Sequence, residues 1–155
     1  MKSGVNAARN RGLRLAAAAA VIAAGVVPAA AAELQAAVAA CEANGAAILA
    51  GNPVPAAIYQ TQVTRYDPPT GRCYVEMRVE TTAAGAGTNR VGRFLYEGTN
   101  GELLAFAETR SGQKSGRVFD LSHTTTTFEN SGWDDAVDYI RLMMTPGRGQ
   151  WDRGQ

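Results

Sequence analysis

The stretch 72-RCYVEMRVE-80 has an apolar residue or cysteine at every second position, and most of the residues between them are charged. Because successive side chains of a β-strand point to opposite faces of the sheet, this period of two predicts a strand over residues 72–82. Its buried face would consist of Cys73, Val75, Met77 and Val79. The charged residues would lie on the other face, where their alternating signs suit cross-strand ion pairs.

The other cysteine of the sequence, Cys41, lies in the alanine-rich segment 33–50, whose apolar side chains recur at helical spacing. The predicted apolar stripe contains Leu34, Val38, Cys41, Ile48 and Leu49. Both sulfurs are therefore expected to face the interface between this helix and the sheet. In an oxidising compartment, two cysteines placed in this way favour a Cys41–Cys73 disulfide.

Two other roles for the cysteines stay open. The sequence Val38-Ala39-Ala40-Cys41 resembles a lipobox, in which Cys41 would be lipidated, although polar residues separate it from the apolar run that precedes it. A catalytic thiol would need a histidine as its base, and His123 is the only histidine in the sequence.

The first 32 residues have the three parts of a secretory signal peptide. Positive charges come first, an apolar run of 18 residues follows over residues 15–32, and three alanines end it as a cleavage site. The positive residues are Lys2, Arg9, Arg11 and Arg14. We therefore expect a signal peptide over residues 1–32 and a periplasmic or secreted protein. The alternative is that the apolar run is retained as a membrane anchor, for which it is slightly short.

The charge balance argues against nucleic acid and anionic membranes as partners. The chain has 15 basic and 14 acidic residues, and four of the basic residues but none of the acidic ones lie in the leader. The mature chain is therefore mildly acidic, and its sequence has no basic run with aromatic residues interleaved. We expect the mature domain neither to bind nucleic acid nor to span a membrane.

Turn-forming residues divide the rest of the chain into short segments. Prolines and glycines predict hairpin turns at residues 67–71 and 98–101, and the glycine-rich segment 111–116 predicts another. Strands are expected over residues 58–66, 72–82, 90–97 and 102–110, with one or two short strands within 117–128. A second helix should begin at Ser131-Gly132 and end at Pro146, with an apolar stripe of Trp133, Val137, Ile140 and Met144.

This order of elements predicts one α+β domain over residues 33–145. It would consist of an N-terminal helix, an antiparallel meander of four to five strands and a C-terminal helix, in two layers. Both helices are expected on the same face of the sheet, which leaves the other face open to water or to a partner. Residues 146–155 are expected to form a disordered tail.

The segment Tyr96-Glu97-Gly98-Thr99-Asn100-Gly101-Glu102-Leu103-Leu104 resembles the hairpin of PepSY-type domains, in which a strand ends in an acidic turn before the next strand begins. A helix followed by an antiparallel meander is also similar to the order of elements in cystatin-like folds. As a whole, the sequence resembles small exported bacterial proteins. The resemblance implies a domain that binds or inhibits rather than catalyses, and it assigns no functional residue.

His123 has Asp120, Ser122 and Glu129 close to it in the sequence. These residue types could form a small hydrolase site. The simpler interpretation is a histidine on an exposed or edge strand. A metal site is disfavoured, because zinc prefers several histidine or cysteine ligands. We therefore expect no catalytic residue, no metal and no cofactor.

Aromatic and charged residues on the strands and in the tail are better candidates for binding. The candidate binding residues are Tyr74, Arg78, Tyr96, His123 and Trp151. We expect a non-catalytic binding or interaction module, whose partner is an unknown protein or small ligand of the cell envelope. The alternatives are an accessory subunit of an envelope complex, which docks through Trp151, and a small hydrolase centred on His123.

Overall fold

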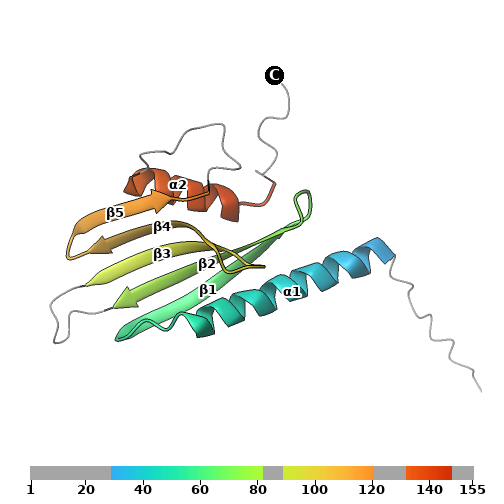
Figure 1. Cartoon of the computed structure of the whole chain (residues 1–155), viewed down its shortest axis with the longest axis horizontal. Coiled ribbons are helices and arrows are strands. Elements are labelled where there is room, and N and C mark those ends of the chain that lie inside the picture. Colours follow the sequence, from blue (N-terminus) through green and yellow to red (C-terminus); the bar gives the residue numbers. More distant parts are fainter. Residues whose placement is uncertain (1–28, 82–88, 121–131, 148–155) are drawn as a thin grey trace, which may run out of the picture.

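The computed structural model describes residues 29–81, 89–120 and 132–147 (Figure 1). Its elements are α1 (Ala29–Gly51), β1 (Ala57–Asp67), β2 (Arg72–Thr81), β3 (Arg90–Glu97), β4 (Leu103–Arg110), β5 (Gln113–Val118) and α2 (Trp133–Met144). The predicted α+β fold, with one helix on each side of the strands in sequence order, is confirmed. Most of the expected signal peptide, His123 and Trp151 lie outside the described residues.

The described strands form one antiparallel sheet in the order β1-β2-β3-β4-β5, and each strand pairs with the next along the chain. The predicted turn over residues 111–116 is too long. Only Ser111 and Gly112 make this turn, both with positive φ (49° and 81°), and β5 begins immediately at Gln113. Two residues with positive φ are enough to form a tight hairpin turn, so a loop of six residues is not required between β4 and β5. The fifth strand therefore begins at Gln113, four residues before the segment 117–128 in which it was expected.

The two helices pack on opposite faces of the sheet, so the expectation that they share one face was wrong. Cys73 and Val75 of β2 pack against Cys41 of α1. Tyr74 lies between them in the sequence and packs instead in the cluster that contains Tyr139 of α2. In Figure 1, α1 runs beside β1, whereas α2 lies beside β4 and β5. Each half of the sheet is therefore covered by one helix, and the two halves use different faces.

The face under α2 is apolar because of β3, β4 and β5. Leu95, Ala105 and Val118 stand opposite one another across these strands and are buried with Tyr139 and Ile140 of α2. Gly116 of β5 allows the helix to approach closely, since a Cβ at this position would lie 2.7 Å from the Cα atom of Trp133. The alternation in β2 alone does not reveal this second apolar face.

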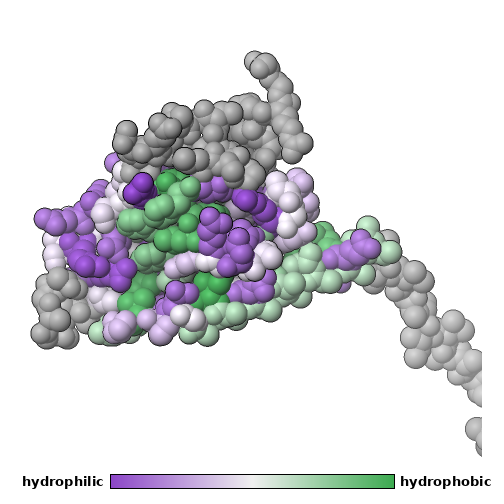
Figure 2. Space-filling view, viewed as in Figure 1, coloured by the Kyte–Doolittle hydropathy of each residue, from purple (hydrophilic) through white to green (hydrophobic). Residues whose placement is uncertain are grey.

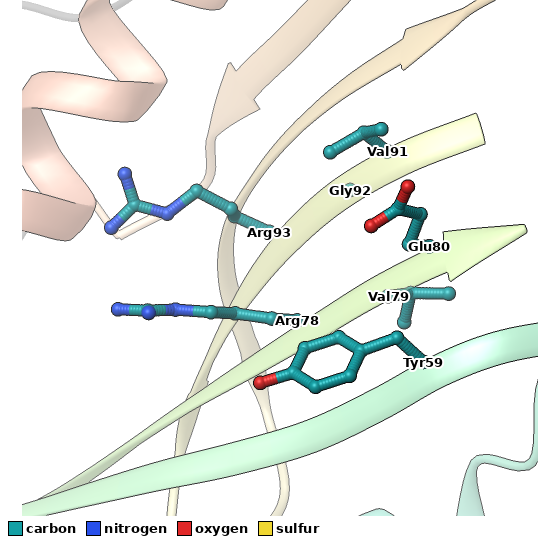
Figure 3. A pocket seen from close by; sticks show the side chains of 7 residues that line it. All are labelled: Tyr59, Arg78, Val79, Glu80, Val91, Gly92 and Arg93. Atoms are coloured by element: carbon teal, nitrogen blue, oxygen red, sulfur yellow. The ribbon is translucent and has the colours of Figure 1, made fainter. Parts of the chain in front are cut away.

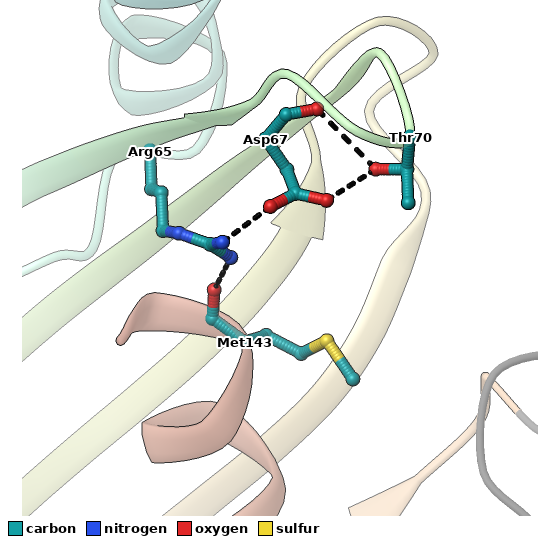
Figure 4. Close-up of polar contacts among 4 residues, drawn as sticks. All are labelled: Arg65, Asp67, Thr70 and Met143. Atoms are coloured by element: carbon teal, nitrogen blue, oxygen red, sulfur yellow. Dashed lines mark hydrogen bonds and ion pairs between the residues drawn. The ribbon is translucent and has the colours of Figure 1, made fainter. Parts of the chain in front are cut away.

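The C-terminal end of α2 is joined to β1 by a polar contact (Figure 4). Arg65 donates hydrogen bonds to the main-chain carbonyl of Met143 and to the carboxylate of Asp67. The hydroxyl of Thr70 donates to the second oxygen of Asp67, at 2.6 Å. The last carbonyls of a helix have no partner within the helix, so a basic side chain at this position stabilises the end of α2.

The predicted disulfide between Cys41 and Cys73 is present and joins α1 to β2, with 5.4 Å between the two Cα atoms. Two glycines make room around it. A Cβ on Gly45 of α1 would lie 2.4 Å from the methyl group of Thr64, and a Cβ on Gly98 would lie 2.3 Å from the sulfur of Cys73. Both positions therefore require glycine for the helix and the 98–101 turn to lie this close to the sheet.

The N-terminal half of α1 extends beyond the sheet. Leu34 and Val38 are exposed, and the buried residues of the helix are Cys41 and Gly45. The prediction of a continuous buried stripe is thus wrong for its first two members, because the helix begins at Ala29 and is longer than the edge it covers. Figure 2 shows this half as a largely pale green rod. By length and composition α1 could cross a membrane, a property that it shares with signal sequences near an N-terminus.

Candidate ligand pocket

A pocket opens on the part of the sheet that α2 leaves uncovered, on the same face as this helix (Figure 3). It has a volume of ≈ 360 Å³, which is within the range of small-molecule sites. Three strands contribute its lining: Tyr59 of β1, Arg78, Val79 and Glu80 of β2, and Val91, Gly92 and Arg93 of β3. The strands fix the position of each of these residues, because all of them lie within the paired ladders.

Arg78 and Arg93 stand directly opposite each other on β2 and β3. Two like charges in such a cross-strand pair repel each other. Glu76 removes this conflict. One of its carboxylate oxygens accepts hydrogen bonds from Nε of Arg78 at 2.8 Å and from Nε of Arg93 at 2.6 Å, and the other accepts one from Nη2 of Arg78 at 3.0 Å. The three residues form a unit, called here the arginine clamp, with a net charge of +1.

Burial and exposure divide the arginine clamp into an anchor and an open end. The side chain of Glu76 is 1% exposed, whereas those of Arg78 and Arg93 are 48% and 30% exposed. The buried carboxylate of Glu76 thus holds both guanidinium groups, and the arginine side chains remain partly exposed to solvent. Arg93 uses only its Nε for Glu76, so its terminal nitrogens make no hydrogen bond to this carboxylate.

The charges of the clamp stabilise one another. Burial by itself would raise the pKa of Glu76, but the hydrogen bonds and charges of Arg78 and Arg93 outweigh burial and lower that pKa below its ordinary value. The hydrogen bond to Glu76 raises the pKa of Arg78. Both shifts move the pKa values away from neutral pH, so Glu76 and Arg78 stay charged at neutral pH.

The other walls of the pocket are apolar and acidic. Tyr59 and Val91 are both 53% exposed, which is high for large side chains on a sheet. Glu80 is paired with Tyr59 on one side and with Val91 on the other, and it has no ion pair among the described residues. In Figure 3 both arginine side chains extend away from Glu80. The pocket therefore has a positive end at the two arginines and a negative end at Glu80, and the side chains that flank Glu80 on the neighbouring strands are those of Tyr59 and Val91.

The structure separates the binding residues that the sequence suggested. Arg78 lines the pocket. Tyr74 is buried under α2, and Tyr96 lies on the other face beside the disulfide. His123 and Trp151 lie outside the described residues. Arg93 was missed, because its position opposite Arg78 depends on the register between two strands, and the sequence of β3 by itself contains no signal for that register.

Asp120, which the sequence grouped with His123, has a structural role. It is buried at the end of β5, where it accepts hydrogen bonds from the hydroxyl of Tyr139 at 3.0 Å and from Arg72 at 3.2 Å. Burial, together with the charge of Asp120, raises the pKa of Tyr139. These contacts connect β2, β5 and α2. Among residues 29–81, 89–120 and 132–147, no group of His, Cys, Asp or Glu side chains could hold a metal ion.

A row of phenylalanines crosses the opposite face of the sheet, although the sequence did not indicate an aromatic platform. Phe106 stacks between Phe94 and Phe119, with ring centroids 6.5 and 6.1 Å away. Arg90 lies 5.3 Å from the centroid of the Phe94 ring, and Arg117 lies 5.5 Å from that of Phe119. The row covers the half of this face that α1 leaves open, so it serves at least to shield the sheet from water.

Comparison with models of protein families, with curated proteins and with solved structures gives no match. The resemblance to PepSY-type and cystatin-like domains therefore stays an expectation, and the function has to be argued from the pocket.

Proposed function

We propose that this protein is an exported, non-catalytic binding domain of the periplasm or the extracellular space, and that it holds a small ligand in the pocket of Figure 3. The disulfide supports export, because such bonds persist in oxidising compartments. The apolar segment that leads into α1 supports it as well, since it has the composition of a signal peptide.

The arginine clamp is the observation that carries this proposal. Its buried carboxylate positions two arginines at the mouth of a pocket, and such pre-positioned charges lower the entropic cost of holding a ligand. A clamp of this kind is poorly suited to general acid–base catalysis, which needs a group whose pKa lies near the working pH. The pKa of Glu76 is lowered and that of Arg78 is raised, so both move further from neutral pH.

Export is tested by expressing the full chain with a C-terminal tag in a Gram-negative host. We expect the periplasmic fraction to contain protein that begins near Glu33 and has no free thiol, because the leader is removed and the two cysteines are joined. Mass spectrometry after thiol alkylation measures both properties. Unprocessed protein with two alkylated cysteines, recovered only from the cytosol, would contradict export.

Binding is tested by screening the folded domain against a chemically diverse set of small molecules with amide NMR spectra. We expect bound compounds to shift the amide signals of Arg78, Val91 and Arg93. The variant Val91→Trp should abolish these shifts, because the larger side chain fills the pocket beside Glu80. The matched control is Val38→Trp, an exposed position on α1, which should leave them unchanged. If no compound shifts the pocket signals, the proposed function is wrong.

A further inference from the structure

The pocket has opposite charges at its two ends, and this arrangement defines the ligand. The arginine clamp supplies a net positive end, and Glu80 supplies a negative end two positions further along β2. Alternate residues of one strand are about 7 Å apart at their Cα atoms. Because the arginine side chains extend away from Glu80, the charged groups themselves are further apart than the backbone spacing.

At each end of the pocket, a charged group is available to pair with an opposite charge on a ligand. Arg78 has Glu76 and Glu80 at equal distances along β2, yet it pairs with Glu76. Glu80 is thereby left exposed and without an ion pair among the described residues, while the terminal nitrogens of Arg93 make no hydrogen bond to Glu76 and its side chain is 30% exposed. A ligand with one positive and one negative charge complements both ends. A ligand with two negative charges would be repelled by Glu80.

Beside Glu80, the walls of the pocket are suited to the uncharged part of a ligand. The ring of Tyr59 and the side chain of Val91 flank Glu80 across the strands and are exposed toward the pocket. These side chains can contact methylene groups or a peptide backbone with small side chains, which such a ligand would place between its charges.

Building on the proposed function, we propose that the pocket binds an extended zwitterion. Its carboxylate is held by Arg78 and Arg93, its ammonium group is held by Glu80, and its uncharged middle lies on Tyr59 and Val91. Two sources share this chemistry. One is an ω-amino acid, and the other is a peptide of two or three residues with free termini, whose extended backbone spans about 7–10 Å. An α-amino acid carries its charges too close together to reach both ends.

A series of six-carbon probes separates the contributions of the two charges. The probes are 6-aminohexanoate, hexanoate, hexylamine and norleucine, with trialanine as the peptide. We expect 6-aminohexanoate to bind about 10-fold more tightly than hexanoate or hexylamine, because each of these lacks one charge-assisted contact. Norleucine should be as weak as the singly charged probes. Trialanine binding more tightly than 6-aminohexanoate would identify the source as a peptide, and the reverse would identify an ω-amino acid.

Two variants assign the ends of the ligand. In Arg93→Gln, 6-aminohexanoate should bind no better than hexylamine. In Glu80→Gln, it should bind no better than hexanoate, and hexanoate itself should not weaken. Arg141→Gln is the control, since it removes an exposed arginine paired with Asp138 on α2. Glu80 is exposed and has no ion pair among the described residues, so its variant keeps the test valid even if Arg93→Gln does not fold.

The outcomes distinguish the inference from the proposed function. Hexanoate binding as tightly as 6-aminohexanoate would overturn the role of Glu80, and equal binding of norleucine would overturn the extended geometry. In both cases the pocket would remain a binding site. If neutral compounds from the screen shift the pocket signals while all the charged probes fail, the inference falls and the proposed function stands. If nothing binds there, both fall.

Discussion

Replacing Cys41 and Cys73 together by alanine is expected to lower the free energy of unfolding by about 3–4 kcal/mol. The two cysteines are 32 positions apart, and a cross-link over a loop of this length reduces the entropy of the unfolded chain by an amount of this size. The effect should be concentrated in α1. This helix buries only Cys41 and Gly45 among its residues, so the disulfide is its main buried link to β2.

Thermal unfolding of the domain from residue 29 onward measures this effect, with an expected decrease in Tm of about 10–15 °C. Wild-type protein in a reducing agent should show a similar decrease, whereas the double alanine variant should not respond to the reducing agent. Hydrogen exchange should show the largest loss of protection in α1. An unchanged Tm of fully reduced wild-type protein would refute the role assigned to this bond.

The second large effect is expected for Glu76→Gln, which should cost about 2–4 kcal/mol. The substitution keeps the size of the side chain and removes its charge. Arg78 and Arg93 would then face each other without a counter-ion, and hydrogen bonds to a charged acceptor would be weakened. Denaturant unfolding measures the change. Glu80→Gln is the control on the same face of the same strand, and it should stay within about 0.5 kcal/mol of wild type.

The loss of stability caused by Glu76→Gln should also depend on pH. The direction of this dependence follows from the lowered pKa of Glu76. A carboxylate whose pKa is lower in the folded state contributes its stability fully above the ordinary value of about 4.3. That contribution is lost as the pH falls through the lower folded-state value. The difference between wild type and Glu76→Gln should thus be constant from about pH 6 to 8 and shrink below about pH 4. A difference that grows on acidification would contradict the assignment.

Features set by residues close in the sequence could be predicted. The alternation around Cys73 gave the strand and its disulfide-bearing face, and the residues of the 98–101 turn gave a hairpin in the right place. The disulfide itself followed from one helical period and one strand period. The boundaries of β5 were misplaced because Ser111 accepts a positive φ, which a serine rarely does.

Features that depend on how strands align could not be predicted. The clamp exists because β2 and β3 pair in the register that places Arg78 against Arg93, with Glu76 next to both. The sequence suggests Tyr74, one of the aromatic residues of the strands, as a binding residue. It is buried because Leu95, Ala105 and Val118, contributed by three later strands, make its face of the sheet apolar enough for α2.

The placement of the helices on opposite faces has a consequence for how the domain tolerates change. The main partners of α1 are β1 and β2, and those of α2 are β4 and β5, so the two interfaces have few neighbours in common. Destabilising substitutions beneath different helices should therefore be additive, since non-additivity requires shared contacts. Such a molecule can accumulate sequence changes in one interface without compensating changes in the other.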